Sequence, residues 1–366
     1  MLKIKKQINL LYITSMLGNL SVTGAWVAIL AARGFSLVEI GFAETVFHIT
    51  SLICEIPSGI LADIYGRKKM LLVSQMMAII GNTIMVFSNG IGMVCLSFVF
   101  HALMYNFASG SGDALAYDSL KSVKQEKRYE KYFSNQMIIY RVGTAISTLC
   151  AGVALFMGYR LAYVISALWH VPILILTGAL VEVRVEALDK EYPDVKRIIR
   201  ELLKYFANSI RFLKDNLKAT KLMFANSFVG AMDILLLFFL QAKLTSAGID
   251  NRALGIALFI MEMGGIVGSK LILKAKKARY ASIFITCSIG VAAGICLEHT
   301  GWIPLMVLGG FLSAMADDAL QIRTDAKLQD MFPSEQRATL ISMGSFTFSV
   351  IMIVLSPLAG YFFSIW

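Results

Sequence analysis

The stretch GILADIYGRKK, residues 59–69, interrupts two long apolar runs with an aspartate, a glycine and three consecutive cations. Gly66 suits a tight turn, because glycine adopts backbone conformations that strain other residues. Asp63 can accept hydrogen bonds at a helix end, and Gly59 leaves room for a neighbouring helix. The cations suit the headgroup layer of a membrane, so the stretch predicts a short turn at a membrane surface between two spanning helices.

The composition of the 366-residue chain points the same way. Of its residues 57% are hydrophobic and 16% are charged, whereas about a quarter of the residues of a soluble domain are charged. Apolar runs of about 20 residues recur, and a helix of that length crosses a hydrocarbon layer ~30 Å thick. A large soluble helical protein is excluded, because too few charges remain to cover its surface.

The apolar runs predict an all-α membrane protein with about eleven transmembrane helices. When alternate breaks are assigned to the cytoplasm, 29 of the 34 Lys and Arg residues fall on that side. This asymmetry places the N-terminus in the cytoplasm and explains the net charge of +10 without nucleic acid. The helices are expected at about 7–31, 36–62, 69–89, 92–121, 131–157, 160–181, 219–245, 252–273, 279–298, 302–330 and 335–364.

The two parts of the chain resemble each other. Asp-Ala-Leu at 113–115 recurs at 318–320, late in the fourth helix of each half, and the same offset aligns other helices approximately. Paired halves of this kind often place one transport site between them. The chain ends where the offset would begin a twelfth helix. The expected organisation is an N-terminal six-helix bundle (1–181), a cytoplasmic linker with an amphipathic helix (182–218) and a C-terminal five-helix bundle (219–366).

The opening stretch resembles the cytoplasmic loop signature GxLADxxGRKxxL of the major facilitator superfamily. The resemblance implies a fold of two pseudo-repeated bundles and a gate that holds the cytoplasmic side closed. In that gate Asp63 and Arg67 would pair with the inner ends of the fourth and eleventh helices, where Asp118 and Arg337 stand. The alternative is that the cations only fix the topology. The matching residues are Gly59, Leu61, Ala62, Asp63, Gly66, Arg67, Lys68 and Leu72.

Ionisable residues inside the apolar runs are the candidates for a transport site, because a charge within a bilayer is costly. Asp233, Glu262 and Asp317 are the candidates for binding a proton or cation, with a structural hydrogen-bonding role as the alternative. Asp113 and Arg141 lie at similar depth in neighbouring helices, which predicts a buried ion pair. Polar residues expected along the substrate cavity are Asn19, His101, Tyr105, Asn106 and Asn226.

The sequence contains no nucleotide-binding loop, metal-ligand cluster or nucleophile–base spacing, so we expect no enzyme, cofactor or metal. The resemblance implies a plasma-membrane secondary transporter of the drug-efflux-like branch, apparently without a twelfth helix, that exports small amphipathic or cationic compounds against protons. Uptake of a nutrient such as a sugar or organic acid, and a non-transporting truncated homologue, are the alternatives. The expected partners are a small-molecule substrate, protons and the lipid bilayer, with a monomeric chain and no nucleic acid.

Overall fold

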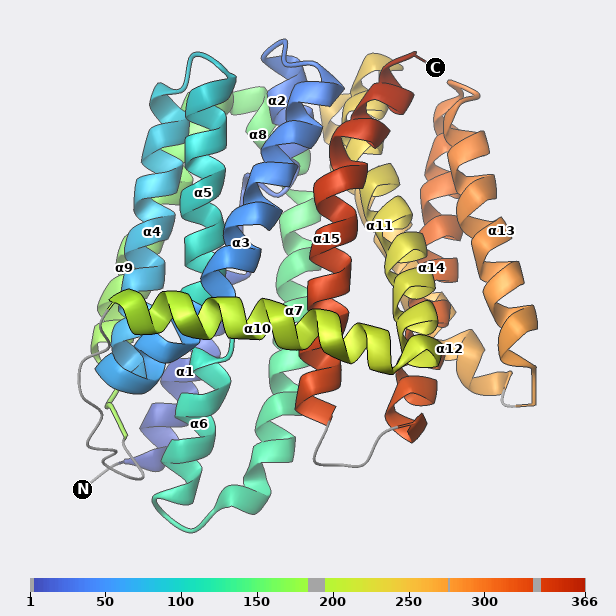
Figure 1. Ribbon diagram of the computed structural model, residues 1–366. Coiled ribbons are helices and arrows are strands. Elements are labelled where there is room, and N and C mark those ends of the chain that lie inside the picture. The colour runs from blue at the N-terminus through green and yellow to red at the C-terminus, as the bar shows by residue number, and fades with distance from the viewer. Residues whose placement is uncertain (1–2, 184–194, 276, 332–336, 366) are drawn as a thin grey trace. The chain divides into compact units, whose positions relative to one another are not determined.

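The computed structural model describes residues 3–183, 195–275, 277–331 and 337–365. These residues form α-helices and one short 3-10 helix, with no strand among them (Figure 1). In this part of the chain nine helical segments are long and apolar enough to span a membrane, and a bent pair makes a tenth. The expected all-α membrane fold is confirmed, and the broken first helix described below accounts for the eleventh segment.

Contacts divide the chain into two compact units. Unit 1 comprises Met1–Gly24, Ile49–Cys150 and Met157–Phe206, and unit 2 comprises Ala25–His48, Ala151–Phe156 and Ala207–Trp366. The helices of unit 1 are α1 (Ile4–Gly18), the later part of α3 (Leu37–Tyr65), α4 (Arg67–Phe87), α5 (Ile91–Ala108), α6 (Ser111–Lys121), η1 (Glu126–Arg128), α7 (Tyr129–Leu149) and α9 (Tyr159–Gly178).

A buried polar side chain connects three helices of unit 1 by hydrogen bonds. The Gln7 amide of α1 donates to the Ser119 hydroxyl of α6 (3.3 Å) and to the Val181 carbonyl after α9 (2.8 Å), and its oxygen accepts from the Val181 N–H (3.0 Å). Around it Leu11, Leu115, Ala116, Tyr132 and Leu180 form a buried cluster. One glutamine thus fixes three helix ends at the base of a small apolar core.

The predicted helix at 7–31 is broken in the structure. It forms α1 and α2 (Trp26–Ala32), with seven non-helical residues between them. Ser147 of α7 satisfies backbone groups freed by the break, since its hydroxyl accepts from the Ser21 N–H (2.8 Å) and donates to the Asn19 carbonyl (2.9 Å). Such a break is tolerated in a membrane only where another group replaces the lost hydrogen bonds.

The predicted helix at 92–121 is also interrupted. Gly110 has a φ of +70° in the left-handed region, and it separates α5 from α6. α5 and α6 together still form one segment that is long and apolar enough to span a membrane. Near the end of the next span the helix is interrupted again, at Cys150 between α7 and α8 (Ala151–Met157).

Unit 2 is held together by glycine contacts that let helix backbones approach closely. A Cβ atom at Gly264 or Gly268 of α12 would run into the Phe311 or Met315 carbonyl of α14. Small residues serve this purpose in membrane helices, which gain little from burying apolar surface. The remaining helices of unit 2 are α11 (Leu217–Ser246), α12 (Asn251–Lys274), α13 (Tyr280–Glu298), α14 (Ile303–Met331) and α15 (Arg337–Ile365).

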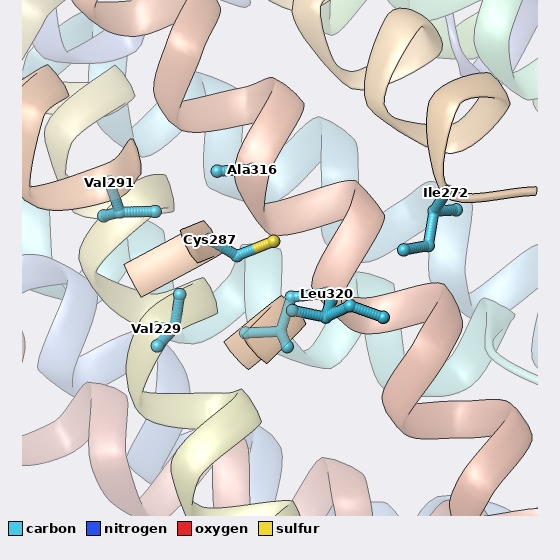
Figure 2. Packing of buried hydrophobic residues seen from close by; sticks show 7 residues of the cluster. Val229, Ile272, Cys287, Val291, Ala316 and Leu320 are labelled. Carbon is cyan, nitrogen blue, oxygen red and sulfur yellow. The ribbon is translucent and has the colours of Figure 1, made fainter. Parts of the chain in front are cut away.

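An apolar cluster on the other side of α14 completes this packing. Figure 2 shows Ala316 and Leu320 of α14 with Cys287 and Val291 of α13 and Val229 of α11. Ala316 and Leu320 point into this cluster. The residue after Ala316, Asp317, therefore points in a different direction, toward Gly230 of α11. The cluster therefore sets the rotation of α14, which carries the acidic residues considered below.

The compact units do not follow the expected sequential halves in two segments. Residues 25–48 and 151–156, which precede and follow outer turns of the first half, group with the second half. Within unit 2 a Cβ atom at Gly41 of α3 would meet the Ser356 backbone of α15, and one at Gly360 would meet the Leu37 backbone of α3. Thr45 also donates to the Ile353 carbonyl (3.0 Å). The start of α3 is thus tightly packed on α15.

The linker contains the expected amphipathic helix, α10 (Val195–Asp215). Its apolar residues Ile199, Leu203 and Ile210 are exposed, which suits a helix that lies in the membrane interface. The beginning of the linker, including the predicted break at Pro193, lies outside the described residues.

Two glycines of α15 provide a test of the α3–α15 packing. Gly360→Ala should lower the apparent unfolding temperature of the detergent-solubilised protein, because an added methyl group forces the backbones apart at a cost of about 1–3 kcal/mol. Gly344→Ala is the matched control, since a Cβ atom there meets nothing described within 4 Å. An equal response of the two variants would contradict the close contact.

Candidate functional site

Unit 2 brings two acidic side chains from different helices side by side. Asp233 lies on α11 and is 4% exposed, and Asp317 lies on α14 and is 8% exposed. The Asp317 carboxylate sits over Gly230, one turn before Asp233, where a Cβ atom would be 3.2 Å from its Oδ1. The two carboxyl groups lie within electrostatic range of each other, and Ser313 of α14 lies beside Asp233.

Two further carboxylates extend this acidic group. Asp318 follows Asp317 on α14 and accepts a hydrogen bond from the Ser269 hydroxyl of α12 (3.3 Å). Its carboxylate lies beside Gly265 of α12, in the space that a side chain at that position would occupy. Glu262, one turn earlier on α12, also interacts electrostatically with Asp233. Three helices therefore contribute carboxylates to one region.

The two central carboxylates are not neutralised by a basic side chain. In the described part of the chain no Lys or Arg nitrogen lies within 4.0 Å of Asp233 or Asp317, and the Asp233 Oδ1 atom has no hydrogen-bond partner. Two ionised carboxylates that are buried side by side repel each other and have lost their hydration. A proton or a small cation between them would relieve this repulsion. No group of described residues has the arrangement of a metal site.

The turn in the opening stretch is built around a carboxylate that the sequence reasoning missed. Gly66 has a φ of +105°, and α4 begins directly after it. Glu182, just after α9, accepts from the backbone N–H groups of Arg67 (3.0 Å) and Lys68 (2.9 Å). A negative charge at these unpaired N–H groups stabilises a helix N-terminus. A side chain at Gly66 would collide with the Glu182 carboxylate.

The guanidinium group of Arg67 links two helices at the same turn. Its Nε lies 3.2 Å from Asp118 Oδ2 at the end of α6, and its Nη2 lies 3.7 Å from Asp63 Oδ1 at the end of α3. The pair with Asp118 is the one implied by the resemblance, although its role as a gate stays a prediction. The side chain of Arg337 lies outside the described residues. Gly59 shows no close helix approach, since a Cβ atom there meets no described atom within 4 Å.

Three of the residues expected along a cavity make hydrogen bonds within unit 1, and their place along a cavity stays a prediction. Asn106 exchanges hydrogen bonds with Ser51 of α3 (2.7 and 2.8 Å) and is buried. His101 bonds to the Ser97 carbonyl (2.9 Å) and packs against Gly81 of α4. Asn19 caps the end of α1, where its amide donates to the Ser15 carbonyl (2.9 Å).

For two other residues, contact with a ligand in the cavity stays a prediction. Tyr105 is 55% exposed and lies within electrostatic range of Glu55 and Tyr140. Asn226 lies two turns before Asp233 on α11, and its buried Oδ1 atom has no described partner.

The predicted ion pair between Asp113 and Arg141 stays a prediction. Asp113 lies in the first turn of α6, where the helix dipole favours its charge. Arg141 lies on α7, and its side chain is exposed.

A second buried charge cluster also went unpredicted. Glu298 at the end of α13 is buried, with Lys243 Nζ at 3.9 Å and His299 Nδ1 at 2.8 Å. In the sequence, Glu298 and Lys243 each lie near the end of a spanning helix. Only the packing of α11 on α13 shows that their side chains meet.

Comparison with known proteins assigns the family. The model of the Major Facilitator Superfamily matches residues 8–316, most of the chain. The chain belongs to this superfamily. A curated relative, the uncharacterized MFS-type transporter YxaM of Bacillus subtilis (strain 168), is 23% identical over 332 residues, which are 87% of this chain and 79% of the relative.

Solved structures show the same fold at low identity. The nucleoside transporter NupG has a TM-score of 0.72 at 16% identity, and the match covers 98% of this chain and 91% of the NupG chain. A bacterial homolog of the human lysosomal transporter Spinster (0.71, 16% identity, 97% and 81% covered) and a D-xylose-proton symporter (0.69, 11% identity, 97% and 89% covered) are also similar. This major facilitator protein is a multi-pass transporter of the plasma membrane, and its family consists of transporters rather than enzymes.

The Glu182 contact at the Gly66 turn predicts a stability effect. Glu182→Gln should lower the free energy of unfolding by about 1–2 kcal/mol, because the neutral amide has one accepting oxygen instead of two charged ones. Glu126→Gln is the control, since Glu126 is exposed in η1. Chemical denaturation in detergent, followed by tyrosine and tryptophan fluorescence, measures the difference. A loss no larger than that of the control would rule out the contact.

Proposed function

We propose that the protein is a proton-coupled secondary transporter that exports small amphipathic or cationic compounds by alternating access. The observation that carries this proposal is the buried Asp233–Asp317 pair of unit 2, which has no described Lys or Arg partner. A static ion pair would already be neutral, whereas this pair needs a positive charge from outside the chain. Within a bilayer the available charges are a proton, a small cation or a cationic substrate.

Exchange follows from competition for the same charge. While the pair holds a proton its net charge is −1, and its attraction for a cationic substrate is weak. Once the proton leaves, the doubly negative pair attracts a cation much more strongly. Binding of substrate and binding of the proton therefore oppose each other, which is the requirement for antiport. Glu262 and Asp318 would strengthen the negative field around the site.

Alternating access also needs a barrier on each side of the membrane. The Arg67–Asp118 pair, together with the Glu182 contact at the same turn, is the proposed cytoplasmic element. The packing of Gly41 on the Ser356 backbone is the proposed outer element, because these contacts must separate for the outer side to open. We further propose that the chain works as a monomer.

Uptake of an uncharged polar nutrient is the second candidate. It is favoured by the exposed phenol groups of Tyr105 and Tyr140, which lie near Glu55 in unit 1. Phenol and carboxylate oxygens are suitable hydrogen-bonding partners for hydroxyl groups, and aromatic faces suit the apolar faces of such compounds.

Transport by everted membrane vesicles tests the proposal. With an imposed proton gradient and a pH-sensitive dye, lipophilic cations should partly collapse the gradient when the wild-type protein is present. Asp233→Asn should abolish the response, since an amide cannot exchange a proton. Asp330→Asn is the matched control, because Asp330 lies exposed near the end of α14, outside the acidic group, and it should respond as the wild type does.

The outcomes separate the two candidates. A response to neutral sugars or nucleosides, with none to the cations, would overturn export of cations in favour of uptake. A full response by Asp233→Asn would show that the buried pair is not the coupling site. Folding of each variant is checked by size-exclusion chromatography before transport is measured.

A further inference from the structure

The end of unit 1 that carries the N-terminus holds a hollow lined with cations that the transport proposal does not use. It has a volume of about 290 Å³ and lies between α1, the end of α6 and the beginning of α7. Lys5 of α1, Arg128 of η1 and Lys131 of α7 line it. The described side chains around this hollow include no carboxylate, so three positive charges converge without a negative partner among them.

The remaining lining gives the hollow a fixed shape. The Tyr12 and Tyr132 rings stack with their centres 5.2 Å apart, and the Asn135 amide donates to the Tyr12 hydroxyl (3.0 Å). Arg128 is oriented by a hydrogen bond to the Gln125 side-chain oxygen (2.7 Å), which leaves most of its N–H groups for another acceptor. A site with arginine, lysine and amide donors suits a phosphate group.

A second, more open hollow of about 450 Å³ continues along the same helix. It shares Lys5 and Asn9 with the first and extends past Leu10 to Ile13, whose side chain is exposed. Ile13 lies about 12 Å further along the helix axis than Lys5, at ~1.5 Å per residue. The cations thus stand at the membrane surface, and the apolar side chains lead from them toward the hydrocarbon layer.

We propose that these two hollows together bind one anionic phospholipid of the cytoplasmic leaflet. The phosphate lies among Lys5, Arg128 and Lys131, and an acyl chain lies along Leu10 and Ile13. The cytoplasmic leaflet is negatively charged, and basic pockets between helices on that side hold acidic headgroups. A soluble phosphate compound would use the same cations, but it would leave the apolar hollow without a function. The inference does not depend on the transported substrate.

Lipid titration of the full-length protein in detergent, read by native mass spectrometry, tests this proposal. The probes are phosphatidylglycerol and phosphatidylcholine with identical acyl chains. Phosphatidylglycerol should bind more tightly, and Arg128→Gln/Lys131→Gln should weaken its binding about tenfold or more while leaving phosphatidylcholine unchanged. The matched control Lys121→Gln/Lys127→Gln removes two exposed cations from the same turn, outside both hollows, and should change binding less than twofold.

A further variant and a soluble probe identify the source of the phosphate. Ile13→Ser should weaken phosphatidylglycerol binding several-fold and leave the binding of glycerol phosphate unchanged. Equal affinity for the two lipids, or an equal loss in the control variant, would overturn the proposal. Glycerol phosphate that binds as tightly as phosphatidylglycerol would also overturn it and would assign the hollow to a soluble phosphate compound.

Discussion

A bilayer cannot hydrate a charge, and the arrangement of this transporter follows from that constraint. Backbone groups are satisfied within helices, and where a helix breaks, as after Asn19, a hydroxyl from a neighbouring helix replaces the lost bonds. The cations are kept in the turns on one side. A carboxylate that remains inside needs a partner, and among the described residues Asp233 and Asp317 lie near each other with no Lys or Arg beside them.

Close backbone packing makes this acidic pair possible. Gly264 and Gly268 bring α12 against α14, and the apolar cluster around Leu320 fixes the rotation of α14. Asp317 is then directed over Gly230 toward α11, while Asp318 fills the space beside Gly265. If both carboxylates are ionised they repel each other, and in the proposed transport cycle a bound positive charge removes that repulsion.

The sequence predicts what depends on composition and on local geometry. The number and direction of the helices follow from hydropathy and from the placement of Lys and Arg, and the turn at Gly66 follows from its signature. The break at Gly110 within the predicted helix at 92–121 was not expected, because a glycine inside an apolar run is also compatible with a continuous helix. The contact of Glu182 with α4, and the convergence of Asp233 with Asp317, depend on packing between helices far apart in the sequence, and no local pattern encodes it.

The central claim is that Asp233 and Asp317 hold one proton between them when no substrate is bound. Infrared spectroscopy of the protein in lipid at neutral pH tests it most directly, through the C=O stretch of a protonated carboxyl group. The account predicts such a band in the wild type, a shift of that band in D₂O, and a change in its frequency or intensity in both Asp233→Asn and Asp317→Asn, since each substitution removes one carboxyl group of the pair. A spectrum without a protonated carboxyl band, or a band unchanged in both variants, would contradict the account.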